Sequence, residues 1–506
     1  MTTTIMASAM AFIDGTALNV VLPSLQQGLN ASGADLFWIL NAYLLMLASL
    51  TLIGGALGDK LGRKKIFGWG IAIFLLGSGL CGFAPNVFSL IIFRAIQGAG
   101  GALMIPGSLS LISSSINEEE RGKAIGTWSA VTTMVTIGGP VLGGLLGDAG
   151  LWRYIFFINL PIGVVTLLFL WRYVKEQKEA GSDKALDIAG AVTIAGGLAL
   201  LTFGFLRIPA IGFSNWEVGS TLGAGLLLLC LFLGLERKSK HPMMPLTLFA
   251  NKTFSGVNLL TFFLYAGLGA GMLFLGLNLV QVQGYSQLQS GLTFLPFTLL
   301  MIVLARYAGS LADKHGPRLF LIAGPAIAGL GLLLLAFVQQ TKGPAEYWTT
   351  FFPGILTFGF GMSITVSPLT ATVMGAVSPH FSGTASGINN AVSRISGVFA
   401  NAIFGALAVL FFAGMLQQQL KTATFPEAQQ QQVLAQAKNL GNAKVPAGIT
   451  GKEQEQIVQL YHESFITAYS RIMLLASGLC FAGALMSLLW VKNPVPGKAQ
   501  NRESAA

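Results

Sequence analysis

Residues 55–64 read GALGDKLGRK, and residues 309–318 repeat the pattern as GSLADKHGPR. Each copy begins with glycine, places an aspartate four residues later, and places a second glycine three residues after the aspartate. Each copy also follows a long apolar stretch, and the two lie about half a chain apart. A pattern that recurs at such a distance indicates that the chain consists of two related halves.

The composition is that of a membrane protein. Hydrophobic residues make up 53% of the chain and charged residues 10%, with a mean hydropathy of +0.68, whereas soluble proteins carry about 25% charged residues. A helix needs roughly 20 mostly apolar residues to cross a bilayer. We predict such spans near 5–23, 36–57, 66–84, 88–110, 125–147, 154–174, 186–206, 217–235, 254–280, 291–311, 319–338, 347–371, 384–413 and 466–491. The expected fold is therefore an all-α integral membrane protein of about fourteen transmembrane helices.

The net charge of +10 reports topology and not a nucleic-acid partner. Lys and Arg cluster after the second, sixth and eighth predicted spans, at 60–65, 172–184 and 237–240, whereas the loops at 84–87 and 284–289 carry none. Because basic loops stay on the cytoplasmic side, we expect a multi-pass protein of the cell membrane with both termini in the cytoplasm. Few residues precede the first span and none is basic, so we expect the natural start to lie upstream of Met1.

The spans suggest three parts. We expect an N-terminal six-helix bundle at 1–180, two inserted transmembrane helices at 181–240, and a C-terminal six-helix bundle at 241–506. The last part contains a polar interruption at 415–464, on the outer side by this count. Apolar residues scattered through its Gln-rich sequence favour short amphipathic helices over a low-complexity segment. The alternative is a docking surface for a partner, such as a periplasmic adaptor protein in an organism with an outer membrane.

Two spans of the first half carry charges at membrane depth. The first contains Asp14, within IDGTALNVVLP at 13–23, and the fourth contains Arg94, within RAIQGAGGA at 94–102. A charge inside a bilayer is costly and marks a functional site. Burial favours a protonated Asp14 while a nearby Arg94 favours the carboxylate, and this balance suits a group that gains and loses a proton. A paired charge with a purely architectural role is the alternative.

The fifth span contains GPVLGG at 139–144. Pro140 removes a helix hydrogen bond, and the glycines remove side-chain bulk, which predicts a bendable and closely packed helix. A part in alternating conformations and simple packing are both compatible with this pattern.

These motifs resemble the major facilitator superfamily, and within it the fourteen-span drug:proton antiporter family of multidrug efflux permeases. The resemblance covers essentially the whole chain and includes WRYIFFINLPIG at 152–163 and QVQGYS at 281–286. Val21 stands where alanine is commoner in the family, and Val135 where the longer antiporter motif has glycine. The resemblance implies the major facilitator fold, with two six-helix bundles and two extra helices between the halves.

The resemblance also assigns roles to residues of this sequence. It implies a proton-coupling and substrate cavity formed by Asp14, Arg94, Asn19, Gln97, Gln281, Asn390 and Arg394. In family geometry the first and fourth helices are neighbours, so Asp14 is the expected partner of Arg94. The antiporter motif corresponds to Gly139, Pro140, Gly143 and Gly144.

The two copies of the loop motif correspond to the family's gating latch between the bundles. Its residues are Gly55, Asp59, Gly62, Arg63, Lys64, Asp313, Gly316 and Arg318. Gly62 permits a tight turn, and Asp59 can accept from N–H groups at a neighbouring helix N-terminus. A loop that only sets topology is the alternative, although it would not require Asp and Gly at matched spacing in both halves.

No catalytic constellation competes with this interpretation. The three cysteines lie apart in apolar spans, the four histidines are scattered in loops, and no GxxxxGK[ST] phosphate loop is present. We therefore expect no metal, no cofactor and no enzymatic activity, and an ion or proton gradient remains as the source of energy.

The sequence thus predicts proton-coupled efflux of lipophilic, cationic or neutral small molecules by alternating access. The expected partners are the substrate, protons and the lipid bilayer, with no nucleic acid. The core spans between 254 and 413 carry Arg306 and Arg394 but no acid, which disfavours a dication and leaves neutral, monocationic and anionic substrates open. The alternatives are an exporter or importer of one physiological solute on the same fold, and an uncoupled channel or receptor.

Overall fold

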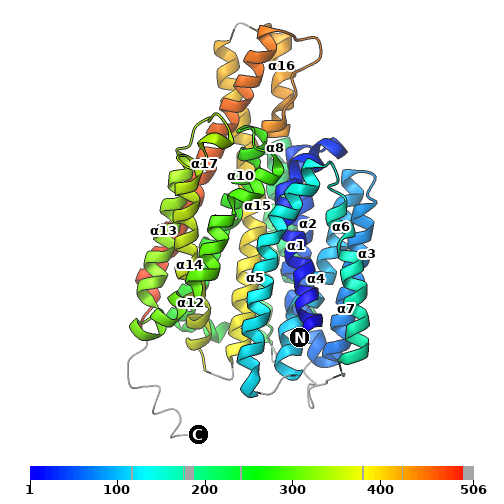
Figure 1. Cartoon of the computed structure of the whole chain (residues 1–506), viewed down its shortest axis with the longest axis vertical. Helices are drawn as coiled ribbons and strands as arrows, with labels where there is room; N and C mark the ends of the chain where they lie inside the picture. The colour runs from blue at the N-terminus through cyan, green and yellow to red at the C-terminus, as the bar shows by residue number, and fades with distance from the viewer. Residues whose placement is uncertain are drawn as a thin grey trace.

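A computed structural model of the chain describes residues 1–115, 118–174, 176, 187–239, 242–378, 381–423 and 425–493. Within these ranges every regular element is a helix and no strand is present. Thirteen helical segments are long and apolar enough to cross a membrane, and α5 (Glu118–Asp148) runs among them over 31 residues (Figure 1). The prediction of an all-helical membrane protein is confirmed for the described part of the chain.

The first half of the chain forms one bundle. Its helices are α1 (Thr2–Leu29), α2 (Gly33–Leu61), α3 (Arg63–Gly82), α4 (Val87–Ser115), α5, α6 (Tyr154–Phe157) and α7 (Asn159–Tyr173). The short α6 and α7 together make one crossing that is interrupted at Ile158. Pro161 lies in the first turn of α7, where its missing N–H leaves no acceptor unpaired.

The second half forms a similar bundle. Its helices are α10 (Lys252–Gln281), α11 (Gln287–Thr293), α12 (Leu295–His315), α13 (Arg318–Ala336), α14 (Phe351–Gly375), α15 (Ser382–Thr422) and α17 (Lys452–Trp490), with short 3-10 turns η1 (Leu246–Ala250) and η2 (Pro344–Glu346). Here α11 and α12 make one interrupted crossing, with Pro296 in the first turn of α12. Each half therefore contains one broken helix.

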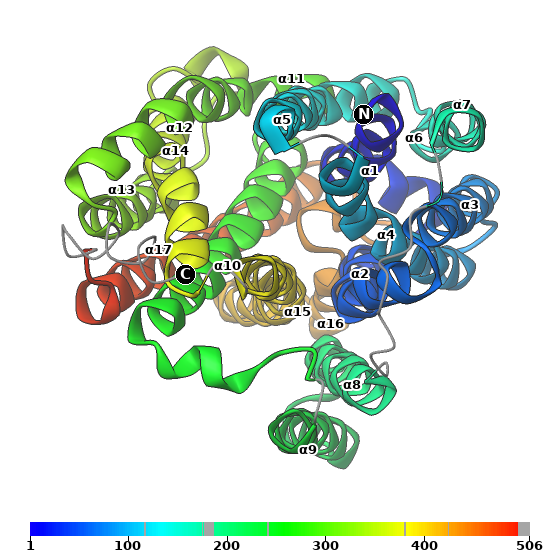
Figure 2. The same ribbon diagram turned by 90° about the horizontal axis from the view of Figure 1, so that it is seen from below.

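Two helices stand outside these bundles. Seen from below, α8 (Ile188–Ile211) and α9 (Trp216–Lys238) form a hairpin at the edge of the molecule, with α8 packed against α2 and α15 (Figure 2). The face of α9 away from the bundles carries exposed Trp216, Leu226 and Leu227. An apolar exterior of this kind is what a lipid environment favours.

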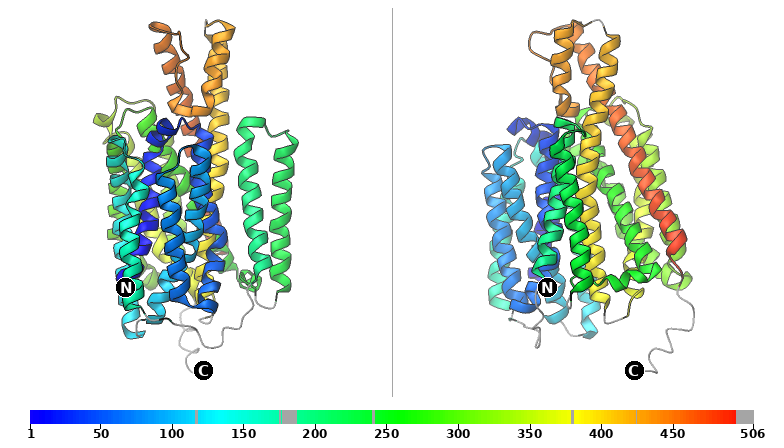
Figure 3. Two further views of the ribbon diagram at one scale, coloured as in Figure 1. Left: turned by 90° about the vertical axis from the view of Figure 1, so that its right-hand side faces the viewer. Right: turned by 180° about the vertical axis from the view of Figure 1, so that it is seen from behind.

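The segment at 415–464, here named the crown, projects beyond the other helices (Figures 1 and 3). α15 has 41 residues and α17 has 39, so each is about 60 Å long, roughly twice the thickness of the hydrocarbon core. The short helices α16 (Glu427–Ala435) and η4 (Gln436–Asn442) complete the crown. Short helices were expected here, and α16 and η4 are short helices. The two ends of the crown, 415–422 and 452–464, instead continue α15 and α17, because their Gln, Ala, Lys and Glu residues favour helix after the apolar run ends. The start of α1 and the end of α17 lie at the opposite end of the molecule (Figure 1).

Candidate functional site

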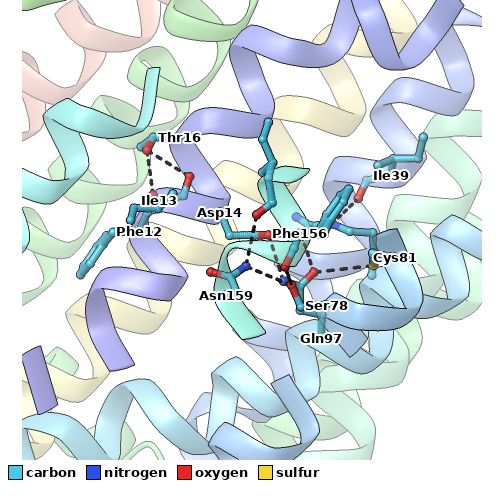
Figure 4. Close-up of polar contacts among 12 residues, drawn as sticks. Phe12, Ile13, Asp14, Thr16, Ile39, Ser78, Cys81, Gln97, Phe156 and Asn159 are labelled. Atoms are coloured by element: carbon cyan, nitrogen blue, oxygen red, sulfur yellow. Dashed lines mark hydrogen bonds and ion pairs between the residues drawn. The ribbon is translucent and has the colours of Figure 1, made fainter. Parts of the chain in front are cut away.

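Asp14, Arg94 and Gln97 form a closed group of hydrogen bonds inside the first half. Arg94 on α4 donates from Nη1 to Asp14 Oδ2 at 2.5 Å and to Gln97 Oε1 at 2.7 Å. Gln97 Nε2 donates to Asp14 Oδ1 at 2.9 Å, and Figure 4 shows these two side chains facing each other. Both carboxylate oxygens therefore have a partner, and none of the three residues is more than 1% exposed.

Aromatic and polar groups from three further helices surround Arg94. Its Nε donates to the carbonyl of Ile39 on α2 at 3.4 Å. Its guanidinium carbon lies 4.3 Å from the ring centre of Tyr43 and 5.8 Å from that of Phe156 on α6. Cys81 on α3 donates from Sγ to Gln97 Oε1 at 3.8 Å. The cation is thus held by hydrogen bonds and by ring faces.

Glycine spacing brings α4 close to its neighbours. Arg94 and Gln97 are three residues apart, so they share one face of α4. A Cβ at Gly98 would collide with the carbonyl of Tyr43, and a Cβ at Gly100 with the backbone of Phe74 on α3. These glycines let helix backbones approach directly, and they therefore set the distance between Arg94 and Tyr43.

Arg94 has hydrogen-bond acceptors whether Asp14 is ionised or protonated. With Asp14 ionised, its charge is cancelled by Arg94 at 2.5 Å. With Asp14 protonated, Arg94 still has Gln97 Oε1 and the Ile39 carbonyl as acceptors. Removing one partner of a buried ion pair costs about 3–5 kcal/mol, and these remaining acceptors reduce that cost.

Three other described residues that were expected in the cavity make no hydrogen bond to Asp14, Arg94 or Gln97. Asn19 is half-buried on α1, with its carbonyl beside Gly276 of α10. Asn390 is exposed on α15, and Arg394 is half-buried one turn further along the same helix. The structure therefore joins Asp14, Arg94 and Gln97 by hydrogen bonds and leaves Asn19, Asn390 and Arg394 outside that group.

Gln281 lies at the crown end, in a network that joins the two halves. Gln26 on α1 accepts at Oε1 from Gln281 Nε2 on α10 at 3.2 Å and from Asn442 Nδ2 on η4 at 2.8 Å. Gln26 Nε2 in turn donates to the carbonyl of Asn439 at 3.3 Å. The network connects the first half, the second half and the crown.

Two glycines of the antiporter motif pack α5 against α1. A Cβ at Gly139 would collide with the side chain of Thr16, and a Cβ at Gly143 with the carbonyl of Ala17. Within the first half, the motif therefore holds α5 against the helix that carries Asp14.

The rest of the motif packs α5 against α11 of the other half. A Cβ at Gly144 would lie 2.5 Å from the Cα of Leu288, and a Cβ at Gly291 would collide with the carbonyl of Pro140. The two backbones thus meet without intervening side chains. We name this contact, together with the Gln26 network, the crown-end seal.

Asp148 strengthens the seal by capping α11. Its carboxylate accepts from the backbone N–H of Gln287 at 2.7 Å and of Leu288 at 3.0 Å. The Gln287 side chain also donates to the hydroxyl of Ser24 on α1. Hydrogen bonds between the halves thus gather at the crown end.

The first copy of the loop motif joins α2 to α3. Gly62 has φ of 109°, a conformation that favours glycine. The N–H of Lys64 donates to Glu176 Oε1, which follows α7, at 3.1 Å. Gly55 lies within α2 and Arg63 opens α3.

The second copy has the same geometry. Gly316 has φ of 86°, and the N–H of Arg318 donates to Asn493 Oδ1, which follows α17, at 3.1 Å. In both copies the loop therefore contacts a residue that follows shortly after the last membrane helix of the same half, α7 or α17. The side chains of Asp59 and Asp313 lie outside the described residues, and with them the expected contact of Asp59 to a helix N-terminus.

Reasoning from sequence missed Tyr43, Gln26, Asp148 and Gln287. The available signal was weak: each is a polar or aromatic residue within or at the end of an apolar span. Within the described residues, no group of three or more His, Cys, Asp or Glu side chains could hold a metal ion.

Comparisons with known proteins find relatives named for drug resistance and export. The chain is 30% identical over 431 residues to the multidrug resistance protein Stp of Mycobacterium tuberculosis, covering 84% of this chain and 78% of Stp. It is 28% identical over 484 residues to the tetracenomycin C resistance and export protein of Streptomyces glaucescens, covering 95% of this chain and 89% of that protein. These relatives are named for transport and resistance, and none for an enzymatic reaction.

Solved structures share the fold. The crystal structure of a bacterial homologue of the human lysosomal transporter Spinster, inward-facing and unoccupied, matches with a TM-score of 0.67 at 19% identity, covering 97% of this chain and 98% of that one. The family model described as Major Facilitator Superfamily matches residues 4–401. The chain is a multi-pass membrane transporter, and it belongs to the Major Facilitator Superfamily.

Proposed function

We propose that this chain is a proton-coupled exporter of lipophilic small molecules that works by alternating access between the half of α1–α7 and the half of α10–α17. Protons move inward down their gradient while the substrate moves outward. The buried group of Asp14, Arg94 and Gln97 carries the proposal. It is a carboxylate at membrane depth whose charge one proton cancels.

Asp14 is the proposed proton carrier. Its ionised form is neutral together with Arg94, and its protonated form leaves one positive charge in the first half. In either form Arg94 keeps the Ile39 carbonyl and Gln97 Oε1 as acceptors. Binding or loss of the proton therefore leaves these two hydrogen bonds in place. Each charge that moves inward gains about 2.3 kcal/mol per 100 mV, enough for a roughly 50-fold substrate gradient.

The crown-end seal supports the direction of the alternation. We place the crown on the outer face and both termini in the cytoplasm of a cell-membrane protein, in line with the basic loops of the sequence. With the seal closed, the halves are in contact on the outer side, which corresponds to the state that takes up substrate from inside. Opening the seal then releases the substrate outward and admits a proton.

The names of the relatives support the substrate class. One is a multidrug resistance protein and another a tetracenomycin C resistance and export protein, so we assign drug-like lipophilic molecules to this chain. A panel of such compounds separates this assignment from transport of one physiological solute, which would leave all but one compound unmoved.

The test is transport by purified protein in liposomes with an imposed pH gradient. We expect uptake of a lipophilic dye into the acidic interior that stops when the gradient is dissipated and is abolished in Asp14→Asn. Asp35→Asn is the matched control, because it makes the same chemical change at the first turn of α2. Dye flux that ignores the gradient would indicate a channel, and full gradient-driven flux in Asp14→Asn would remove Asp14 as the carrier.

A further inference from the structure

Arg394 on α15 is a guanidinium that lies between the two halves. The helix that carries it, α15, packs against α2 of the first half and against α10 of the second half. Arg394 therefore lies on a helix of the interface between the halves. It remains only partly buried, so a ligand can reach it.

Among the described residues, Arg394 has no acidic partner. Asp14 is already engaged at both oxygens by Arg94 and Gln97. Five further acids near the ends of membrane helices are bound to other groups; they are Asp35, Asp148, Asp187, Glu217 and Glu236. Arginine keeps its proton and offers only donors, so Arg394 is a cation without a counterion.

The face of α15 that carries Arg394 borders open space. Gly387, Asn390, Arg394 and Gly397 lie on one side of the helix, at spacings of three and four residues. A methyl group added at either glycine would meet no atom within 4 Å. Asn389, on the other side, anchors α15 by hydrogen bonds to α10 at 2.7 and 3.1 Å.

The unmatched charge of Arg394 favours one kind of ligand. A guanidinium beside open space, with no carboxylate among the described residues to neutralise it, is satisfied by an anion.

We propose that Arg394 binds an anionic substituent of the transported molecule, so that the exporter prefers lipophilic molecules that carry a carboxylate or a comparable anion. The proposal rests on the proposed export function, and it selects the anionic class from the neutral, monocationic and anionic substrates that the sequence leaves open. A carboxylate can accept from both arms of a guanidinium. Arg94 cancels the charge of ionised Asp14, so Asp14 does not repel such a ligand.

The direction of transport is compatible with this charge. The interior of a cell is electrically negative, so an anion that moves outward travels with the membrane potential. The outward anion and the inward proton then both draw on that potential.

The test is equilibrium binding to the purified full chain, without any gradient, using two fluorescent probes. Pyrenebutyrate carries a carboxylate, and pyrenebutyramide has the same ring and a neutral amide. We expect the carboxylate to bind about tenfold more tightly. Arg394→Gln should remove that preference and leave amide binding unchanged, whereas Arg394→Lys should keep part of it because the charge remains.

Arg207→Gln is the matched control, because Arg207 lies on α8 outside the bundles and pairs with Glu217. It should leave both affinities unchanged. Equal binding of the two probes by the unmodified chain would overturn the proposal, as would an equal loss of both probes in Arg394→Gln. Gradient-driven flux of both probes is measured separately, and failure of both would refute the export function without bearing on the charge preference in binding.

Discussion

Replacing Gly144 with alanine is expected to open the crown-end seal. A Cβ at this position would stand 2.5 Å from the Cα of Leu288 and 2.6 Å from the carbonyl oxygen of Gln287. Carbon atoms in contact are about 3.5–4.0 Å apart, so α5 and α11 must separate by roughly 1 Å. Overpacking of this kind costs about 1–3 kcal/mol. This cost falls only on the sealed state, in which the two helices touch. Since about 1.4 kcal/mol is a factor of ten, the sealed state should lose roughly tenfold in population.

Gly138→Ala is the matched control on the same helix. A Cβ at Gly138 would meet no atom within 4 Å. The substitution raises the helix preference of α5 by the same amount, about 0.5–1 kcal/mol, without disturbing the seal. Any difference between the two variants therefore reports the contact with α11.

The assay is the distance between spin labels at Leu145 on α5 and Leu292 on α11, whose side chains are 51% and 42% exposed. Labels are placed in a chain without its three cysteines. We expect a longer distance to gain population in Gly144→Ala and not in Gly138→Ala. An unchanged distribution in Gly144→Ala, or the same shift in both variants, would refute the argument that this contact holds the sealed state.

Three further predictions follow from the same contacts. Arg94→Ala should impair gradient-driven export by removing the partner of Asp14. The double variant with Asp14→Asn should be little worse than either change alone, because coupled residues are non-additive; additive losses of export rate would separate the two sites. Asp148→Ala removes two hydrogen bonds to α11 and should lower the thermal stability of the sealed state by about 1–3 kcal/mol, read as a lower unfolding temperature; no shift would mean that the cap is dispensable. Single cysteines at Lys438 and Lys498 should differ in labelling by an impermeant thiol reagent on intact cells, with Lys438 labelled, and equal labelling would contradict the proposed topology.

The spans, and the need of Asp14 and Arg94 for partners, could be predicted from sequence for physical reasons; that they pair with each other followed from the resemblance to the family. A bilayer requires long apolar helices whose backbone groups are satisfied internally. Within such helices a carboxylate and a guanidinium are rare and need partners. Gly62 and Gly316, which both have positive φ, were likewise visible in the spaced repeat.

The rotation of each helix about its axis could not be predicted, because helices that are apolar on all faces have no stripe that marks the buried side. The placement of Tyr43 on Arg94 depends on this rotation, and so does the contact of Gln26 with Gln281. The crown was foreseen as an interruption but not as a continuation of α15 and α17, since a drop in hydropathy marks the end of a membrane crossing and not the end of a helix.

The most direct measurement of the central claim is substrate-evoked proton release from the purified chain in weakly buffered solution. Adding a transported substrate should release protons from the unmodified chain, because in the proposed cycle substrate and proton exchange at Asp14. Asp14→Asn should bind the substrate and release none. Release of the same number of protons by Asp14→Asn would contradict the account, because the exchanged proton would then reside on another group.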